Sequence, residues 1–134
     1  GIVLRDGSDC TIAACGITVS IALEAADALK QEGISCRVID MFSIKPIDAE
    51  LLEKAARETG GIVTCEEHNV MAGFGSAVAE TISDIYPVPV KRIGVRDQFG
   101  ESARDNEISL LLEKHGITSI HISNTVKAIR SQTR

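Results

Sequence analysis

Residues 60–82 have the sequence GGIVTCEEHNVMAGFGSAVAETI, which joins a strand to a helix through a polar loop. The two glycines at its start end a helical stripe, and the apolar run Ile62–Cys65 that follows is typical of a buried strand. From Phe74 onward, apolar residues recur at helical spacing. Those expected to face inward are Phe74, Ala77, Val78, Ile82 and Ile85. A strand placed between two helices predicts a mostly parallel sheet with helices on both faces.

The same alternation extends in both directions from this unit. Strands are expected at Ile2–Leu4, Thr11–Cys15, Ile34–Ile39, Ile62–Cys65 and Val90–Val95. Helices are expected after Gly16, Asp48, Ala72, Ser102 or Asp105, and Thr118, with stops at Gly33, Gly60 and Gly116. The turn formers Asp6-Gly7-Ser8-Asp9 predict a hairpin between the first two strands, which puts one antiparallel strand at an edge. We therefore expect one compact α/β domain over residues 1–134.

The composition excludes several classes of protein. The chain has 134 residues, a net charge of −5 and 25% charged side chains. This acidic balance argues against a general nucleic-acid or anionic-membrane surface, because both require basic patches. No apolar run reaches the roughly 20 residues that span a bilayer, and no secretory signal is visible. Because the chain opens at Gly1, without a methionine, and enters a strand at once, we expect a piece of a longer protein.

Four cysteines lie in or beside predicted strands, at positions 10, 15, 36 and 65. They form no CxxC pair and are not interleaved with the three histidines at zinc-finger spacing. Cys10 and Cys15 are five residues apart in one strand, so their side chains should point to opposite faces. We expect buried, reduced thiols and a cytoplasmic location. A redox or metal-binding module built on the cysteines is the competing hypothesis.

Three loops follow strand carboxyl ends, the edge at which open α/β sheets bind their ligands. The loop 16–20 leads into the N-terminus of a helix, a position that can bind an anion. It lacks the glycine-rich motifs of phosphate-binding loops. A single glycine between a strand and a helix, such as Gly16, more often allows tight packing. The loop that starts at Glu66 also contains Glu67 and His68. These residue types suit an acid/base pair or half a metal site. They equally suit a polar loop whose carboxylates cap backbone amides or contact a partner.

The third loop, residues 96–102, places Phe99 among charged residues. This side chain has two alternative roles: it fills the core of the domain, or it anchors a partner protein at the surface. Since this loop and the preceding one follow parallel strands, they should meet at one edge of the sheet. The loop that starts at Glu66 has no nucleophile, third metal ligand or basic clamp, so we expect contact with a partner rather than catalysis. The interface candidates are Glu66, Glu67, His68, Phe99, Glu101 and Ser102.

An ordered series of motifs resembles the C-terminal domain of transketolase over nearly the full length of the chain. The series comprises Ala13–Gly16, Glu24–Leu29, Cys36–Phe42, Ile44–Asp48, Ile62–His68, Gly73–Ala77, Ile93–Val95 and Phe99–Ser102. Related domains close the beta subunits of 2-oxo-acid dehydrogenases and deoxyxylulose-phosphate synthase. The Glu-Glu-His and Phe-Gly-Glu-Ser runs are more similar to transketolase. Ala72 and Ala103 depart from glycines that are common in the family.

The resemblance implies a three-layer α/β/α fold with a five-stranded mixed sheet whose first strand is antiparallel. It also implies a place in an enzyme that uses thiamine diphosphate and Mg²⁺ to transfer two-carbon ketol units between sugar phosphates, in the pentose phosphate pathway. Other domains of that family bind the cofactor, through a Gly-Asp-Gly…Asn motif and an activating Glu. This chain has neither motif, so no catalytic, cofactor-binding or metal residue carries over.

The implied partners are the diphosphate-binding and pyrimidine-binding domains of the same enzyme, which is expected to be a homodimer, with no nucleic acid and no membrane involved. The isolated domain is expected to be inactive and to bind no cofactor. Some such enzymes are split into two polypeptides, and this chain would then end the second. The alternative is a free-standing module that binds a small molecule or nucleotide at the Gly16 helix terminus.

Overall fold

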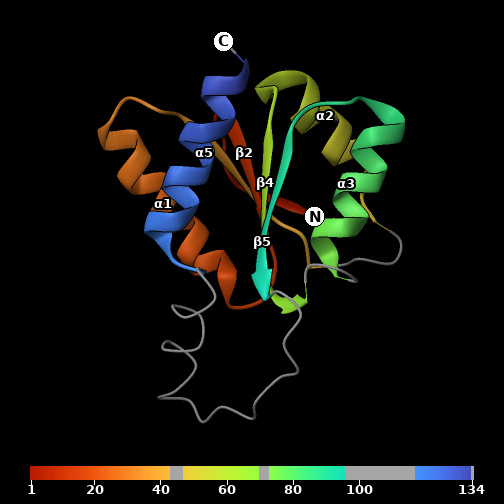
Figure 1. The fold of residues 1–134 in the computed structure, drawn as a ribbon, viewed down its shortest axis with the longest axis horizontal. Coiled ribbons are helices and arrows are strands. Elements are labelled where there is room, and N and C mark those ends of the chain that lie inside the picture. Colours follow the sequence, from red (N-terminus) through yellow and green to blue (C-terminus); the bar gives the residue numbers. More distant parts are fainter. Residues whose placement is uncertain (43–46, 70–72, 96–116, 134) are drawn as a thin grey trace, which may run out of the picture.

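The computed structural model describes residues 1–42, 47–69, 73–95 and 117–133. Its elements are β1 (Ile2–Arg5), β2 (Cys10–Ala14), α1 (Thr18–Gln31), β3 (Cys36–Asp40), α2 (Ala49–Thr59), β4 (Ile62–Asn69), α3 (Phe74–Ile85), β5 (Val90–Val95) and α5 (Ser119–Thr133). Figure 1 shows three layers, with α1 and α5 on one face of the sheet and α2 and α3 on the other. The helix expected between Ser102 and Gly116 lies outside the described residues.

The strands of the described residues form one five-stranded sheet in the order β1-β3-β2-β4-β5. The first strand, β1, runs antiparallel to β3. The other neighbours pair in parallel: β3 with β2, β2 with β4, and β4 with β5. The expected three-layer α/β/α architecture, with an antiparallel first strand at an edge, is thus confirmed.

The predicted hairpin between the first two strands is wrong, because β3 lies between them. The segment Asp6–Asp9 instead crosses the start of β3. The backbone N–H of Asp9 donates to the Ser35 carbonyl at 2.8 Å. Gly7 passes so close to β3 that a Cβ at this position would lie 2.3 Å from the carbonyl carbon of Cys36. Turn-forming residues occur in crossovers as well as in hairpins. The strand that pairs with β1 is β3, which lies farther along the chain than the prediction assumed.

A buried arginine attaches this crossover to the sheet. Arg37, on β3, donates from Nε to Asp6 Oδ1 at 2.9 Å and from Nη2 to Glu58 Oε1 at 2.6 Å. Burial alone would lower the pKa of Arg37, but the hydrogen bonds to Glu58 and Asp6 outweigh burial and raise that pKa. The Gly7 backbone N–H and the Arg37 guanidinium hold the pKa of Asp6 below its ordinary value of 3.8. One guanidinium therefore joins the β1–β2 crossover to the C-terminal part of α2.

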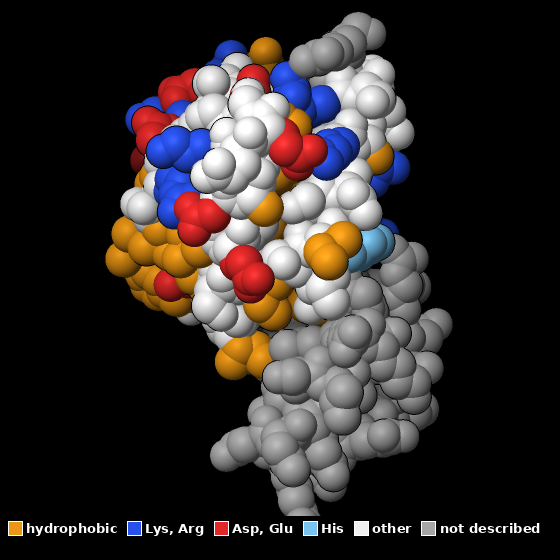
Figure 2. All heavy atoms as spheres, turned by 90° about the vertical axis from the view of Figure 1, so that its left-hand side faces the viewer, with side chains coloured by type: hydrophobic (Ala, Val, Ile, Leu, Met, Phe, Trp, Pro, Cys, Tyr) orange, Lys and Arg blue, Asp and Glu red, His pale blue; other side chains and the backbone are white. Residues whose placement is uncertain are grey.

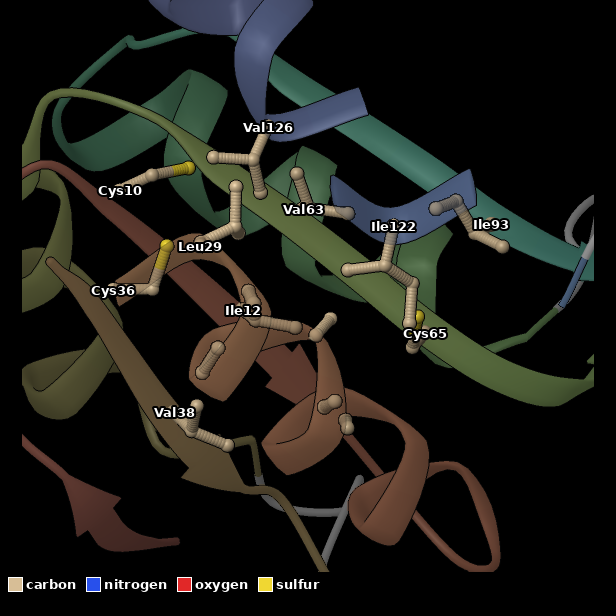
Figure 3. Close-up of a cluster of buried hydrophobic side chains, with 14 of the residues drawn as sticks. Cys10, Ile12, Leu29, Cys36, Val38, Val63, Cys65, Ile93, Ile122 and Val126 are labelled. Atoms are coloured by element: carbon tan, nitrogen blue, oxygen red, sulfur yellow. The ribbon is translucent and has the colours of Figure 1, made fainter. Parts of the chain in front are cut away.

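The core consists of two hydrophobic clusters, one on each face of the sheet. Alternate strand residues enter opposite clusters: Ile12 packs with α1 and α5, whereas Ala13 packs with α2 and α3. Figure 3 shows the α1/α5 side, where Leu29 lies close to Cys10 and Cys36 of two neighbouring strands. Aliphatic side chains supply most of this packing, as the 3% aromatic content predicts.

The local signals for helix ends are confirmed at four positions in the described ranges. Gly33 and Gly60, at the ends of α1 and α2, have positive φ angles of 79° and 72°. At the start of α2, the Asp48 carboxylate accepts a backbone N–H of the first turn at 3.2 Å. The Thr118 hydroxyl does the same for α5 at 3.1 Å. The start and the end of a helix depend on residues that are adjacent in the chain, so the local sequence pattern predicts them.

Two details of α3 and β4 differ from the prediction. Ile85, expected to face inward, is exposed at the last position of α3, and Tyr86 and Val88 pack against the α2/α3 cluster beyond it. The strand β4 continues to Asn69 instead of ending at Cys65, with an irregular register toward β5 between these residues. The polar run that follows Cys65 is therefore part of a strand.

Candidate functional site

The interface candidates follow or extend the carboxyl ends of β4 and β5. Those in the segment 96–102 lie outside the described residues: Phe99, Glu101 and Ser102. Glu67 and His68 belong to β4, but the structure describes only their backbone. Glu66 is the candidate whose side chain and contacts are described. The predicted meeting of the two loops at one edge stays a prediction.

Glu66 is a buried carboxylate near the carboxyl end of β4. Its two oxygens accept the backbone N–H groups of Phe74 and Gly75, at 2.5 and 3.1 Å. These N–H groups open α3, whose N-cap residue, Gly73, makes no side-chain cap of its own. A negative charge is stabilised at the positive end of a helix dipole. The alternative in which a carboxylate of this run caps backbone amides is thus confirmed for Glu66.

This geometry commits Glu66 to structure. A general acid or base must bring an oxygen within hydrogen-bond reach of a substrate, but both oxygens of this carboxylate face helix amides and no part of the side chain reaches the surface. Within the described ranges, no three His, Cys, Asp or Glu residues lie close enough together to hold a metal ion. We therefore assign none of the described residues to Mg²⁺ or to thiamine diphosphate.

Close packing between β4 and α3 surrounds this cap. A Cβ at Gly75 would lie 2.7 Å from the hydroxyl oxygen of Thr64, so the glycine lets α3 approach the sheet. Thr64 is buried, and its hydroxyl has no hydrogen-bond partner within the part of the chain that the structure describes. At the surface, Arg92 of β5 donates from Nη1 to the Ser76 hydroxyl at 3.0 Å. These contacts hold the first turn of α3 against the sheet.

The turn at Gly16 positions a buried threonine between two strands. Gly16 has a φ of 64°, and the helix α1 begins two residues later at Thr18. The Thr18 hydroxyl lies 2.7 Å from the Cys15 carbonyl and 2.9 Å from the Cys65 carbonyl. It joins the end of β2 and the middle of β4 to the start of α1. This arrangement supports tight packing as the reason for the glycine.

None of the four cysteines forms a disulfide; three of them are buried and Cys15 is half-buried. Cys10 and Cys15 contribute to opposite clusters, as their spacing predicts. Burial raises the pKa of Cys10 and of Cys36 to about 12, because a thiolate would lose its hydration there. At neutral pH these thiols are protonated, which makes them poor nucleophiles and poor metal ligands. They give no support to the redox or metal hypothesis.

Comparison with known proteins finds similarity to the C-terminal domains of transketolases and to a related enzyme. A family model described as "Transketolase, C-terminal domain" matches residues 1–122. One of the subunits of the apulose-4-phosphate transketolase from Phocaeicola vulgatus is 47% identical over 116 residues, which cover 85% of this chain and 37% of that protein. The 6-deoxy-6-sulfo-D-fructose transketolase subunit SqwH from a Clostridium species is 43% identical over 120 residues, 90% of this chain and 36% of that protein.

Two further similarities complete the comparison. The 1-deoxy-D-xylulose-5-phosphate synthase of Heliobacterium modesticaldum is 42% identical over 135 residues, 100% of this chain and 20% of that protein. A solved structure described as a split-gene transketolase in an inactive beta4 tetramer has a TM-score of 0.89 and 50% identity, covering 99% of this chain and 42% of that one. This chain thus spans 20–37% of the length of these curated relatives. Of the helices in the described ranges, none has the length and apolar composition that crossing a membrane requires.

Proposed function

The chain belongs to the family of transketolase C-terminal domains, and on this premise we propose that it is the non-catalytic assembly domain of a transketolase-type enzyme. The parent enzyme transfers two-carbon ketol units between sugar phosphates in the pentose phosphate pathway of the cytoplasm. Other domains bind its thiamine diphosphate and Mg²⁺. The partners of this domain are the diphosphate-binding and pyrimidine-binding domains, and the parent enzyme is a homodimer.

One observation carries the non-catalytic part of the proposal. The carboxyl ends of parallel strands are where α/β folds place reactive groups, and Glu66 is the buried carboxylate found there. Its oxygens are occupied by the first amides of α3. A carboxylate in this position organises the sheet edge and leaves the chemistry to residues outside this domain.

The assembly part is supported by the kinds of protein that resemble this chain. Two of the relatives are described as transketolase subunits, and the similar solved structure is described as a tetramer. Each relative carries most of its length outside the region that matches this chain. This domain recurs in proteins that are mostly made of other domains, and its buried carboxylate, Glu66, caps a helix. Both features fit a role in holding subunits or domains together.

The contact surface of the proposal is the sheet edge that carries Glu66, Glu67, His68, Phe99, Glu101 and Ser102. An aromatic side chain with a polar rim is the typical composition of an interface centre. Replacing Phe99 by alanine is expected to weaken dimerisation or docking by roughly 1 to 3 kcal/mol, the range of a lost aromatic anchor. If Phe99→Ala instead unfolds the isolated domain, this side chain is a core plug and not an anchor.

The deciding experiment compares the parent polypeptide with a version that lacks residues 1–134. Ketol transfer and sedimentation are measured for both, and again after purified chain is added back to the truncated version. We expect truncation to abolish transfer and assembly, and addition of the chain to restore part of each. A truncated enzyme that is fully active and dimeric would refute the assembly role.

A second candidate is a parent enzyme of the 1-deoxy-D-xylulose-5-phosphate synthase type. The relative from Heliobacterium modesticaldum matches all of this chain at 42% identity, close to the identity of the transketolase subunits. The assembly role of the domain is the same under both candidates. Assaying the parent polypeptide for formation of 1-deoxy-D-xylulose 5-phosphate beside ketol transfer separates them.

A further inference from the structure

The outer edge of the sheet is formed by an apolar strand. On its inner side β1 pairs with β3, and in the described residues no strand pairs with its outer side. The three residues Ile2, Val3 and Leu4 are 53%, 42% and 45% exposed. Ile2 pairs with Asp40 and Val3 with Ile39, so adjacent β1 side chains point to opposite faces of the sheet and both are uncovered.

An exposed aromatic residue extends this apolar edge. Phe42 is 65% exposed and follows Asp40, the cross-strand partner of Ile2, by two residues. We refer to Ile2, Val3, Leu4 and Phe42 as the β1 surface. In Figure 2 a group of hydrophobic side chains lies at the left edge of the described part of the molecule, with an acidic side chain among them, and most charged side chains lie above or beside this group. An apolar cluster of this kind marks a surface that a partner covers.

The β1 surface lacks the exposed charges that commonly protect an edge strand. Exposed edges commonly carry charged residues that discourage contact, but the charged residue of β1, Arg5, makes an ion pair with Asp27 of α1 at 2.5 Å. The register shifts between Val3 and Arg5, and such a bulge disfavours the addition of another strand. Contact through the side chains, rather than through a new strand ladder, fits this edge.

The size of the surface indicates which kind of partner covers it. Stable interfaces between separate molecules bury roughly 1,200–2,000 Å² in total, which four half-exposed side chains do not approach. A domain joined covalently to β1 has a high effective concentration and needs far less contact area. The relatives are about three to five times as long as the matching region, and the family is described as a C-terminal domain, so other parts of such a protein precede it.

We propose that the β1 surface docks against an apolar face of the domain that precedes it in the parent polypeptide. This inference rests on the proposed function, because it requires that the chain be the end of a larger enzyme. Docking at this position orients the whole sheet relative to the preceding domain, since β1 is bonded along its length to β3 and is tied to α1 by Arg5. The contact would set the angle at which the sheet edge with Glu66 meets the rest of the enzyme.

Thiol labelling in the intact parent polypeptide tests the contact. Leu4→Cys replaces an exposed edge side chain, and three of the four native cysteines of residues 1–134 are buried, so this domain adds little background. We expect labelling of the new thiol in the native parent to be more than about 100-fold slower than in the same variant unfolded in urea. Ile120→Cys, at the start of α5 and 73% exposed in wild type, is the matched control and should label within about tenfold of its unfolded rate.

Each outcome bears on the proposal separately from the assembly role. A Leu4→Cys rate within about tenfold of its unfolded rate overturns the docking surface. Protection that disappears on dilution also overturns it, because the occupant is then a second molecule. If truncation of residues 1–134 abolishes assembly but Leu4→Cys labels freely, the proposed function stands and the surface is wrong. If Leu4→Cys is protected while truncation has no effect, the contact stands and the assembly role falls.

Discussion

Replacing Gly7 by alanine tests the crossover between the first two strands. A methyl group at this position would lie 2.3 Å from the Cys36 carbonyl carbon and 2.5 Å from the Arg37 amide nitrogen. Both are backbone atoms of β3, so no side chain can swing away. Ordinary contact begins at 3.4 Å, and the crossover must therefore retreat by about 1 Å.

The cost follows from the bonds that a retreat of this size breaks. Asp9 donates its backbone N–H to the Ser35 carbonyl at 2.8 Å, and its carboxylate accepts the Ser35 N–H at 2.7 Å. Ser8 donates to the same carbonyl at 3.2 Å. At about 0.5–1.5 kcal/mol for each lost bond, Gly7→Ala should lower the free energy of unfolding by about 2–4 kcal/mol. For a chain of this length that is a loss of roughly 10 °C in Tm.

Urea and thermal unfolding of the 134-residue chain measure this loss against two controls. Ser8→Ala changes the neighbouring exposed residue and should stay within about 0.5 kcal/mol of wild type. Gly33→Ala has open space around the new methyl group but a φ of 79°, so it should cost only about 1–2 kcal/mol. If Gly7→Ala is as stable as Ser8→Ala, the close approach of the crossover to β3 is refuted.

Three further predictions concern the helix cap, the thiols and the cofactor. Glu66→Gln should lower the free energy of unfolding by about 1–3 kcal/mol, because it puts an amide NH₂ against a helix N–H; wild-type stability in urea would contradict the cap. A thiol reagent should modify Cys10 and Cys36 only after unfolding and Cys15 fastest in the native state, and rapid native labelling of either buried thiol would contradict their burial. Folding raises the pKa of the Cys10 and Cys36 thiols from 9.0 to about 12. The free energy of unfolding should therefore be unchanged below pH 9 and should fall as pH rises toward 12. This decline should be smaller in a Cys10→Ala/Cys36→Ala variant. Titration calorimetry of the chain with thiamine diphosphate and Mg²⁺ should show no stoichiometric isotherm, and a micromolar one would contradict the absence of a cofactor site.

Sequence reasoning succeeded where the signal and its cause lie close together in the chain. Glycines at 33 and 60 adopt positive φ angles at helix ends, and Asp48 caps the helix that it precedes. The alternation of strands and helices predicted the layers, because each apolar stripe has to be buried against a sheet. The antiparallel first strand was predicted twice, by the turn formers at residues 6–9 as one strand of a hairpin, and by the family resemblance.

Sequence reasoning failed where the structure of a segment depends on residues that are far away in the chain. Asp6-Gly7-Ser8-Asp9 has the composition of a hairpin turn, and only the insertion of β3 makes it a crossover. The amides capped by Glu66 lie eight and nine residues away, so the glutamate was grouped with polar loop residues. A glutamate at the end of an apolar strand, shortly before a Gly-Phe-Gly helix start, is a signal from which the cap could have been predicted. The partner-facing roles of Phe99, Glu101 and Ser102 stay predictions.

The strand order has a consequence for how the domain forms on the ribosome. In the sheet, β1 and β2 both pair with β3, although β3 is made after them and after the whole of α1. No native strand pair can close until residue 40 has been added, about 30 residues after β2 begins. At roughly 5–20 residues per second, two apolar strands therefore wait unpaired for roughly 2–6 s. During that interval the nascent chain offers its hydrophobic edges to chaperones or to other nascent chains. The arrival of β3 then pairs one side of each strand in a single step, and the other side of β2 stays open until β4 is made.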